Sequence, residues 1–376
     1  MSSVPTGSVP MSSVPMSSVA VGSGLRPVAV RASDVSIRIP TPSGWVTPMD
    51  GISLDLYQGE VLGIVGETGS GKTVTCRSLL GLLPAVKATH TGLVSYPGIL
   101  EENVLDMGRK RMRRFWGKHV SMIPQNPMTS LNPVHRIGDQ IAEAVAAHAT
   151  MSRGQRRDRV IELMTRVGIP VPEKRVRDYP HQFSGGMLQR TLIAIALAGS
   201  PKVLIADEPT TALDVIIQDQ ILSLLMELQR DIGMSLVMVS HDLSVISQLA
   251  DRVGVMYAGQ LVELAPTAQL LGNPQHPYTA ALLQSLPAAV PRDQPLTTIA
   301  GMPPRLVDLP ASCRFVPRCA FAEPECGQWT SELLASEPGT GLVRCRRHGE
   351  LSLGTFATGE QVRAGPSAAI AARHPD

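Results

Sequence analysis

The sequence predicts an α/β fold, in which a mainly parallel sheet carries helices, follows a β-rich region and precedes a small cysteine-containing module. Three observations predict this fold. Apolar and polar residues alternate in 28–40 and 52–60, which is typical of half-buried strands. A buried strand, a glycine loop and a helix are expected in order within 60–83. Two apolar strands within 202–209 and 235–242 flank one long helix, an order typical of parallel sheets.

Composition divides the chain into four parts. Residues 1–26 repeat a Ser-Ser-Val-Pro unit, in which recurrent proline forbids a helix, so we expect a disordered leader there. The main α/β domain is expected over 27–272, a Pro-rich linker and C-terminal module over 273–353, and a loose Ala/Gly-rich tail over 354–376. A helical subdomain within the main domain is expected from three segments: 136–149, 153–168 and 185–198.

The composition also limits the classes of protein to consider. Hydrophobic residues make up 43% of the 376 residues, enough to bury a core, although aromatic residues make up only 3%. The net charge of +2 gives no strong field to attract nucleic acid, and the basic run 109–118 is expected to be a solvated helical face. No run of about 18 apolar residues occurs, so we expect no segment that spans a membrane unaided.

The segment 66–73, GETGSGKT, fits the phosphate-loop pattern G-x-x-x-x-G-K-[ST] and lies between a predicted strand and helix. Its glycines let the backbone come close to phosphates, which the N–H groups at a helix start bind. Lys72 is expected to contact the γ-phosphate and Thr73 to bind Mg²⁺. The expected ATP-binding residues of the loop are Gly66, Glu67, Thr68, Gly69, Ser70, Gly71, Lys72 and Thr73.

Two carboxylates end the first of the later apolar strands. Asp207 is expected to hold Mg²⁺ through water, and Glu208 to polarise the attacking water. A second candidate anion site is formed by Ser184, Gly185 and Gly186, which open a predicted long helix. Because one chain needs only one phosphate loop, the second site favours contact with a nucleotide held by another subunit.

Six motifs in this order resemble those of the ABC-type ATPases. They are the phosphate loop, a glutamine loop around Gln125, the stretch FSGGM, the strand LIADEP, TALD at 211–214 and SHD at 240–242. The resemblance covers roughly residues 28 to 270. It implies a parallel-sheet core with an antiparallel β subdomain and a helical subdomain. It also implies that two ATPase subunits enclose two ATP molecules, each signature helix capping the partner's γ-phosphate.

The resemblance assigns roles to three further residues. Gln125 is expected to contact Mg²⁺ and to couple the subunits, Asp214 to contact the dimer partner, and His241 to contact the γ-phosphate. Glu208, His241 and Gln125 are therefore the expected catalytic residues, and Thr73, Gln125 and Asp207 the expected Mg²⁺ ligands.

Two positions depart from the general ABC pattern. Met187 stands in the signature where that family has glutamine, so an amide contact would be missing. The expected place of the adenine-stacking aromatic falls near Ser43, and Trp45 is the nearest ring. Trp45 is therefore the candidate adenine contact.

A second resemblance narrows the family. The stretches IPQNPMTSLNP, HQFSGGMLQR and NPQHPYTAALLQSLP, and the cysteine-rich text after them, are similar to ATPase subunits of oligopeptide/dipeptide/nickel importers. This implies an ATP-hydrolysing subunit that drives peptide uptake from the cytoplasmic face of the cell membrane. The implied partners are a second ATPase in a heterodimer, two permease subunits and an extracellular substrate-binding protein. Nickel import and a soluble ABC ATPase of nucleic-acid maintenance are the alternatives, although no nucleic-acid partner is expected.

Four of the five cysteines fall in the C-terminal module: Cys313, Cys319, Cys326 and Cys345. Stable disulfides are disfavoured in the reducing compartment of such an ATPase. Four thiolates hold zinc or an iron–sulfur cluster, and the spacing C-x5-C-x6-C-x18-C is wider than usual zinc knuckles. We therefore favour a [4Fe–4S] cluster, with zinc or free thiols as alternatives. Its expected role is structural or redox-sensing, without a link to the ATP chemistry.

Overall fold

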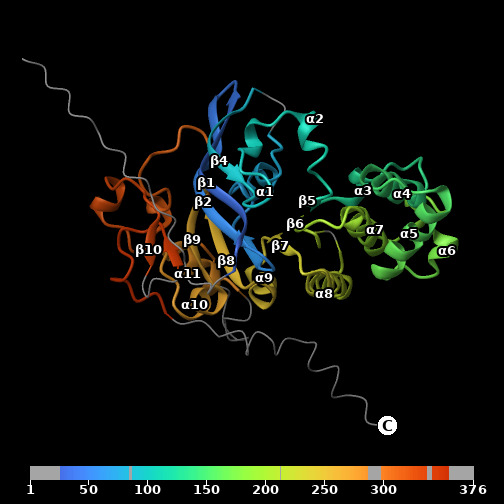
Figure 1. The fold of residues 1–376 in the computed structure, drawn as a ribbon. Helices are drawn as coiled ribbons and strands as arrows, with labels where there is room; N and C mark the ends of the chain where they lie inside the picture. The colour runs from blue at the N-terminus through green and yellow to red at the C-terminus, as the bar shows by residue number, and fades with distance from the viewer. Residues whose placement is uncertain (1–25, 84–86, 212, 287–297, 337–340, 355–376) are drawn as a thin grey trace, which may run out of the picture.

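The structure, a computed structural model, describes residues 26–83, 87–211, 213–286, 298–336 and 341–354. The expected leader and tail lie almost wholly outside these residues. Figure 1 shows the described part in three regions: a central β-rich body, a lobe of helices α3 to α7 on one side of it, and the C-terminal module on the other.

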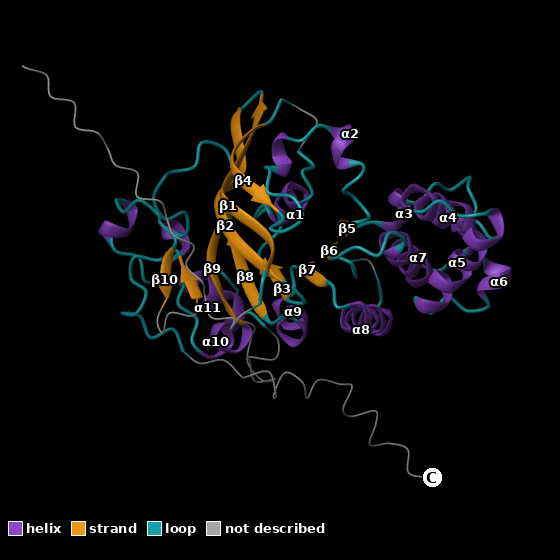
Figure 2. Ribbon diagram, viewed as in Figure 1, coloured by secondary structure: helices purple, strands orange, loops and turns teal. Residues whose placement is uncertain are grey.

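The central body is built on one mixed sheet of eight strands in the order β10-β11-β9-β8-β3-β7-β6-β5 (Figure 2). The five strands from β8 to β5 are parallel, as the strand–helix–strand pattern predicts, and β9, β11 and β10 continue the sheet antiparallel. Their bounds are β3 Val61–Val65, β5 Val120–Ile123, β6 Val203–Asp207, β7 Ser235–Val239, β8 Arg252–Tyr257, β9 Gln260–Pro266, β10 Leu334–Ser336 and β11 Gly341–Val343.

A separate antiparallel sheet of three strands packs beside the main sheet. It has the order β2-β1-β4, with β1 at Val28–Thr41, β2 at Gly44–Tyr57 and β4 at Thr89–Ser95. Its alternating apolar residues share one buried cluster with residues of β3 and α1, including Leu62 and Leu79. The predicted antiparallel β region is therefore present, and it lies against the strand and helix that flank the phosphate loop.

The helices cover the main sheet or form the helical lobe. Each longer helix turns one apolar face inward. In α4, for example, Ile137, Ile141 and Val145 are buried, one turn apart along the helix. The bounds are α1 Lys72–Leu79, α2 Arg109–Met112, α3 Pro127–Ser130, α4 Ile137–His148, α5 Arg153–Arg166, α6 Pro172–Arg175, α7 Gly185–Leu197, α8 Val215–Ile232, α9 Leu243–Leu249, α10 Thr267–Gly272 and α11 Pro277–Gln284. Of the helices in the described ranges, none has both the length and the apolarity that crossing a bilayer requires.

The lysines and arginines of the basic run 109–118 are exposed, as expected of a solvated face, but most of the run is not helical. Only four of its residues form a helix, α2, and that helix buries Met112. Phe115 is also buried, against the ring of Tyr96. Arg111 pairs with Glu102 at the surface. The apolar residues Met112 and Phe115 therefore pack around the antiparallel sheet. The many basic residues beside them give no indication of this packing in the sequence.

The C-terminal module is attached to the main sheet by strand pairing. In β11, Leu342 pairs with Leu264 and Val343 with Glu263, both in β9. The hairpin of β10 and β11 thus extends the sheet that carries the phosphate loop, so this part of the expected module continues the fold of the preceding domain.

The packing of α9 on β3 gives a test of the fold. A Cβ added at Gly63 would lie 2.1 Å from Cγ2 of Ile246 and 3.2 Å from Cβ of Ala250. Gly63→Ala is therefore expected to lower the free energy of unfolding by about 1–3 kcal/mol, because an overpacked core must shift. Thermal unfolding measures the effect. Gly108→Ala is the control, since a Cβ there meets nothing within 4 Å; equal melting of the two variants would contradict the α9 packing.

Candidate active site

The phosphate loop runs from the end of β3 to the start of α1. Gly69 and Gly71 have φ of 81° and 103°, in the left-handed region that favours glycine. A Cβ at Gly71 would also lie 2.0 Å from the carbonyl oxygen of Pro48, whereas beside Gly69 nothing lies within 4 Å. The first glycine thus leaves one side of the loop open, and the second lets the loop pack on β2.

Lys72 lies under the loop as the motif predicts. It is 5% exposed, and its Nζ donates to the carbonyl oxygens of Gly66 at 2.8 Å and Glu67 at 3.0 Å. Burial lowers the pKa of Lys72, while the carboxylates of Glu208 and Asp207 oppose that shift. The hydroxyl of Ser70 is buried with no hydrogen-bond partner among the described residues. An ammonium group and an unpartnered hydroxyl in one loop fit the binding of an anionic phosphate.

The predicted Mg²⁺ ligands from two motifs meet at the start of α1. Thr73 donates its hydroxyl to Oδ1 of Asp207 at 3.2 Å. Asp207, at the end of β6, is 2% exposed, and burial raises its pKa although the Thr73 hydrogen bond opposes the shift. A hydroxyl beside a buried carboxylate is a donor set of the kind that Mg²⁺ takes next to nucleotide phosphates. These residues therefore fit the ion.

Glu208 lies next to the other two predicted catalytic residues. Its Oε2 accepts from Nε2 of Gln125 at 2.7 Å and from the hydroxyl of Thr211 at 2.9 Å, and it lies 3.8 Å from Nδ1 of His241. Gln125 follows β5, Glu208 follows β6 and His241 follows β7, so the site forms where three adjacent parallel strands end. Thr211 is a contact that the sequence analysis did not assign to Glu208.

The backbone of Glu208 is strained. Its φ of 48° lies in the left-handed region, where residues other than glycine, asparagine and aspartate are rare. Its N–H donates to the carbonyl oxygen of Val239 in β7 at 3.0 Å, which fixes this turn at the edge of the sheet. Such strain concentrates at functional sites, and here it turns the carboxylate toward Gln125 and His241.

The predicted signature lies away from the loop of its own chain. Ser184 is the N-cap of α7, and its hydroxyl accepts from the N–H of Met187 at 3.4 Å. Figure 1 places α7 in the helical lobe, apart from α1 in the central body. Asp214 caps α8 by accepting from the N–H of Ile217 at 3.0 Å. Both residues have a local structural task, and their roles toward a second subunit stay predictions.

Trp45, the predicted adenine contact, lies in the β1–β2 hairpin opposite Pro40 and is 45% exposed. The pocket beside the phosphate loop is lined instead by its neighbour Val46, by loop residues such as Gly69, and by Pro303–Val307 of the C-terminal module. The backbone N–H of Thr47 donates to the carbonyl oxygen of Leu306 at 2.8 Å. Sequence reasoning missed this segment, because nothing in a Pro-rich stretch signals where it packs.

The expected separation between the cysteine module and the ATP chemistry is wrong. Arg318, next to Cys319, forms a bidentate ion pair with Glu67 of the phosphate loop. Its Nη1 lies 2.9 Å from Oε2 of Glu67 and its Nη2 lies 3.1 Å from Oε1. The two residues are 251 positions apart, so no local pattern could indicate the contact.

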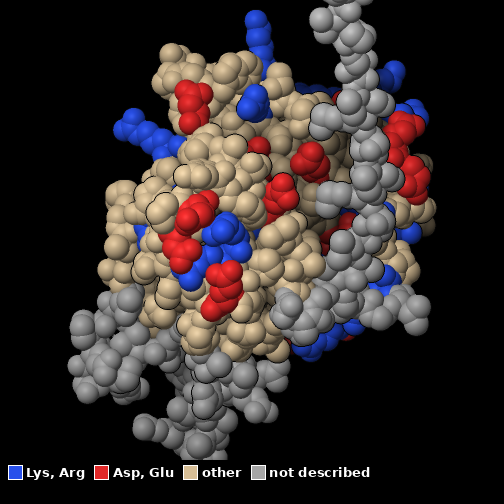
Figure 3. Space-filling view, turned by 90° about the vertical axis from the view of Figure 1, so that its left-hand side faces the viewer, with Lys and Arg blue, Asp and Glu red and all other residues tan. Residues whose placement is uncertain are grey.

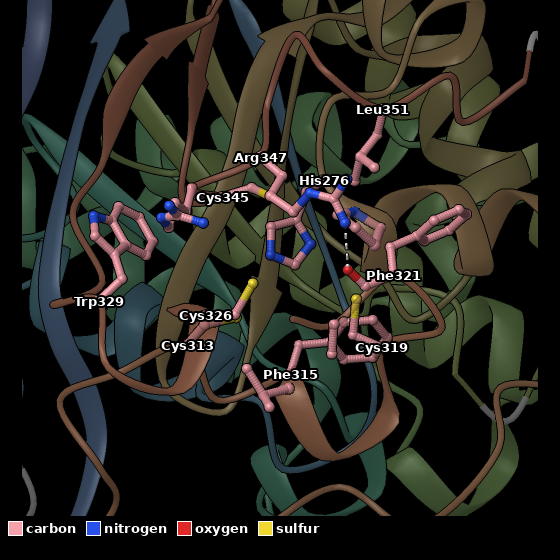
Figure 4. A pocket seen from close by; sticks show the side chains of 14 residues that line it. His276, Cys313, Phe315, Cys319, Phe321, Cys326, Trp329, Cys345, Arg347 and Leu351 are labelled. Atoms are coloured by element: carbon pink, nitrogen blue, oxygen red, sulfur yellow. Dashed lines mark hydrogen bonds between the residues drawn. The ribbon is translucent and has the colours of Figure 1, made fainter. Parts of the chain in front are cut away.

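All four C-terminal cysteines line one pocket, which they reach from separate segments (Figure 4). Burial raises the pKa of Cys313 and Cys319 and raises the pKa of Cys345 to about 12. His276 also lines the pocket, but its Nδ1 accepts from the N–H of Tyr278 at 3.0 Å and its pKa is lowered to about 3 by burial. Burial thus favours the neutral form of Cys313, Cys319 and Cys345, beside a neutral imidazole.

The described residues contain no group of three or more His, Cys, Asp or Glu side chains gathered closely enough to hold a metal ion.

The rim of the cysteine pocket carries ion pairs: Arg347 contacts Glu323 at 2.7 Å and Glu350 at 3.2 Å. Its Nη1 also donates to the carbonyl oxygen of Phe321 at 3.0 Å. Figure 3, which shows the face on this side of the molecule, has acidic and basic side chains interspersed. Cys76, the fifth cysteine, is fully buried in α1.

Comparison with known proteins agrees with the fold. Residues 49–211 match the family described as ABC transporter, and residues 262–326 match the oligopeptide/dipeptide transporter C-terminal region. A dimeric post-hydrolysis structure of the ATP-binding cassette MJ0796, bound to ADP and Pi, has a TM-score of 0.56 and 25% identity. The aligned region covers 63% of this chain and 98% of the MJ0796 chain. The fold and the phosphate loop therefore define an ABC ATPase, which hydrolyses ATP.

Similar curated proteins narrow the class. The dipeptide transport ATP-binding protein DppD of Haemophilus influenzae is 46% identical over 299 residues, 79% of this chain and 88% of that protein. The oligopeptide transport ATP-binding protein OppD of Bacillus subtilis is 44% identical over 295 residues, 78% of this chain and 82% of that protein. The chain belongs to the oligopeptide/dipeptide family of ABC transporter ATP-binding subunits.

Proposed function

We propose that this chain hydrolyses ATP to drive the import of peptides through separate permease subunits. The observation that carries the proposal is that the phosphate loop and the Glu208 cluster share one sheet with a C-terminal region of the oligopeptide/dipeptide type. A nickel importer and an ATPase of nucleic-acid maintenance are the competing functions.

In the proposed mechanism the phosphate loop binds ATP through its backbone N–H groups. When ATP binds, Nζ of Lys72 leaves the two carbonyl oxygens and contacts the γ-phosphate. The unpartnered hydroxyl of Ser70 donates a hydrogen bond to a phosphate oxygen. Thr73, Gln125 and Asp207 would hold Mg²⁺, which would supply positive charge to offset the charge of the phosphates. His241 contacts the γ-phosphate from the end of β7. Trp45, in the hairpin that joins β1 and β2, remains the proposed aromatic contact to adenine.

Glu208 polarises the water that attacks the γ-phosphate. Its Oε2 accepts from Gln125 and Thr211, and its other oxygen, Oε1, is the one that accepts a hydrogen bond from the water. The hydrogen bond from Gln125 is the contact through which the glutamine loop would couple nucleotide binding to the catalytic carboxylate.

The assembly we propose contains two permease subunits, a second and distinct ATPase, and an extracellular substrate-binding protein. Ser184, Gly185 and Gly186 cap the ATP of the second ATPase, and Asp214 contacts that subunit. The chain acts at the cytoplasmic face of the cell membrane without spanning it. Within the chain, we propose that 27–272 forms the ATPase domain and 273–353 the C-terminal module.

Uptake by whole cells tests the cargo. A strain that lacks the gene is expected to lose ATP-dependent uptake of labelled di- and oligopeptides, while the wild-type gene restores it and the Lys72→Ala gene does not. Uptake of radioactive nickel is measured in parallel. Loss of nickel uptake with intact peptide uptake would replace peptide import by the nickel function.

We further propose that the four cysteines of the C-terminal module hold a [4Fe–4S] cluster, as the sequence analysis favours over zinc. The support is that four thiols line one pocket, and that the charges of Arg344 and Arg347 act on Cys313 and Cys319 respectively. One zinc ion requires its thiolates at about 2.3 Å, whereas a four-iron cluster spreads them further apart. When bound, the cluster would supply a structural cross-link and a redox-sensitive group.

Anaerobic purification tests the cluster. The protein is expected to be brown and to contain about four irons per chain, and Cys319→Ser is expected to remove the colour. Cys76→Ala, which changes the cysteine outside the module, should keep it. Colourless wild-type protein, with one zinc or with no metal, would reject the cluster.

A further inference from the structure

Glu67 is held at every polar group. Its N–H donates to the hydroxyl of Tyr278 in α11 at 3.1 Å. Its carbonyl oxygen accepts from Nζ of Lys72 at 3.0 Å and from the N–H of Ser70 at 3.1 Å. Its carboxylate receives both Nη atoms of Arg318. The conformation of the phosphate loop therefore depends on two residues outside the loop and its helix, Tyr278 and Arg318.

Arg318 has no freedom to leave this position. Its Nε donates to the carbonyl oxygen of Ala300 at 2.8 Å, and its remaining donors reach the hydroxyl of Tyr257 and the carbonyl oxygen of Ile299 at 3.4 Å. The guanidinium lies 5.7 Å from the ring centroid of Tyr257, and the side chain is only 6% exposed. A buried guanidinium whose donors are all used fixes its partner in one geometry.

The backbone of Arg318 is held between two of the pocket cysteines. Val316–Arg318 forms one 3-10 turn, in which the N–H of Val316 donates to the carbonyl oxygen of Cys313 and the N–H of Cys319 to that of Val316. A single turn of backbone therefore joins Cys313 and Cys319 to Arg318. The other two buried arginines of the module, Arg314 and Arg344, contact the β sheets instead.

We infer that Arg318 is a positioning residue of the phosphate loop, through which the cysteine-bearing module sets the affinity for ATP. The inference rests on the proposed binding of ATP at this loop. With Arg318 in place, the carboxylate of Glu67 is neutralised and held toward the C-terminal module. Without it, an unpaired carboxylate remains in the loop that must receive the triphosphate, and the loop loses its outer clamp.

The test is a double-mutant cycle in the full-length chain, with the dissociation constant of MgATP as the readout. Arg318→Gln is expected to raise that constant about tenfold, equivalent to about 1.4 kcal/mol. In a Glu67→Gln background the same change should have less than about a twofold effect, because the charge that Arg318 neutralises is gone. In the assembled transporter, the KM for ATP should rise while kcat stays within about twofold.

Arg314→Gln is the matched control, since it breaks another buried ion pair of the module, with Asp50, and its donors reach Asp50 and Ala258 instead of Glu67. It should leave ATP affinity within about twofold. Equal effects of Arg318→Gln in both backgrounds, or an equal effect of Arg314→Gln, would overturn the assignment. Arg318→Lys, which keeps the charge, should retain part of the affinity and serves if the Gln variant does not fold.

The link to the thiols is measured in the same way. Cys319→Ser is expected to weaken ATP binding in the wild-type background and to have no further effect with Arg318→Gln present. Independent effects of the two changes would overturn the path through Arg318. Failure of the proposed function is a different result: the wild-type chain would then not bind MgATP, or Lys72→Ala would bind it equally well.

Discussion

Glu208→Gln is expected to lower ATP turnover of the assembled transporter by about 10²- to 10⁴-fold while ATP binding persists. An amide cannot take a proton from water, whereas its oxygen can still accept from Gln125 and Thr211 as the carboxylate does. The geometry of the site is therefore retained and only the chemistry is lost. Turnover is measured by phosphate release, and binding by equilibrium titration with MgATP.

The melting temperature of Glu208→Gln controls for folding and should match that of the wild type. Thr211→Val is a second control, because it removes one contact to the carboxylate and leaves the base in place. Turnover of Glu208→Gln within threefold of the wild type would show that another residue polarises the water.

The second large effect concerns the chain by itself. A monomeric preparation is expected to be nearly inactive, because the signature at Ser184 lies in the helical lobe and we assign it to the ATP of a partner. Co-expression with the second ATPase and the permeases should restore turnover. The measurement is turnover per chain across a concentration series, with the oligomeric state followed by sedimentation.

A matched variant sharpens that experiment. Ser184→Ala in this chain should reduce turnover at the partner's nucleotide while leaving MgATP binding to this chain unchanged. Full turnover by a demonstrated monomer, independent of concentration, would contradict a site shared between two subunits.

The sequence predicts the parts of this fold whose residues are close together in the chain. The strand Val61–Val65 and the helix from Lys72 could be placed because the apolar run, the glycines and the start of the helix follow one another directly in the sequence. Asp207 at the end of β6 and Glu208 after it could be placed for the same reason. Parallel pairing then brings the ends of β5, β6 and β7 together, which is why Gln125, Glu208 and His241 meet.

Contacts made over long sequence distances could not be predicted. Arg318 reaches Glu67 across 251 positions, and the sequence offers several arginines near the cysteines without a sign of which one is buried. The strands β10 and β11 have three residues each, too short for a period to be recognised. For these reasons the C-terminal module was expected to be independent of the ATP site, whereas it shares a sheet and an ion pair with it.

The most direct test of the account is ATP turnover by the complete transporter in lipid vesicles, with and without peptide-loaded binding protein. We predict that peptide-loaded binding protein stimulates turnover and that Lys72→Ala abolishes both the basal and the stimulated rates. Turnover that ignores the peptide-loaded binding protein, or that continues in Lys72→Ala, would contradict an ATPase that drives peptide import through this phosphate loop.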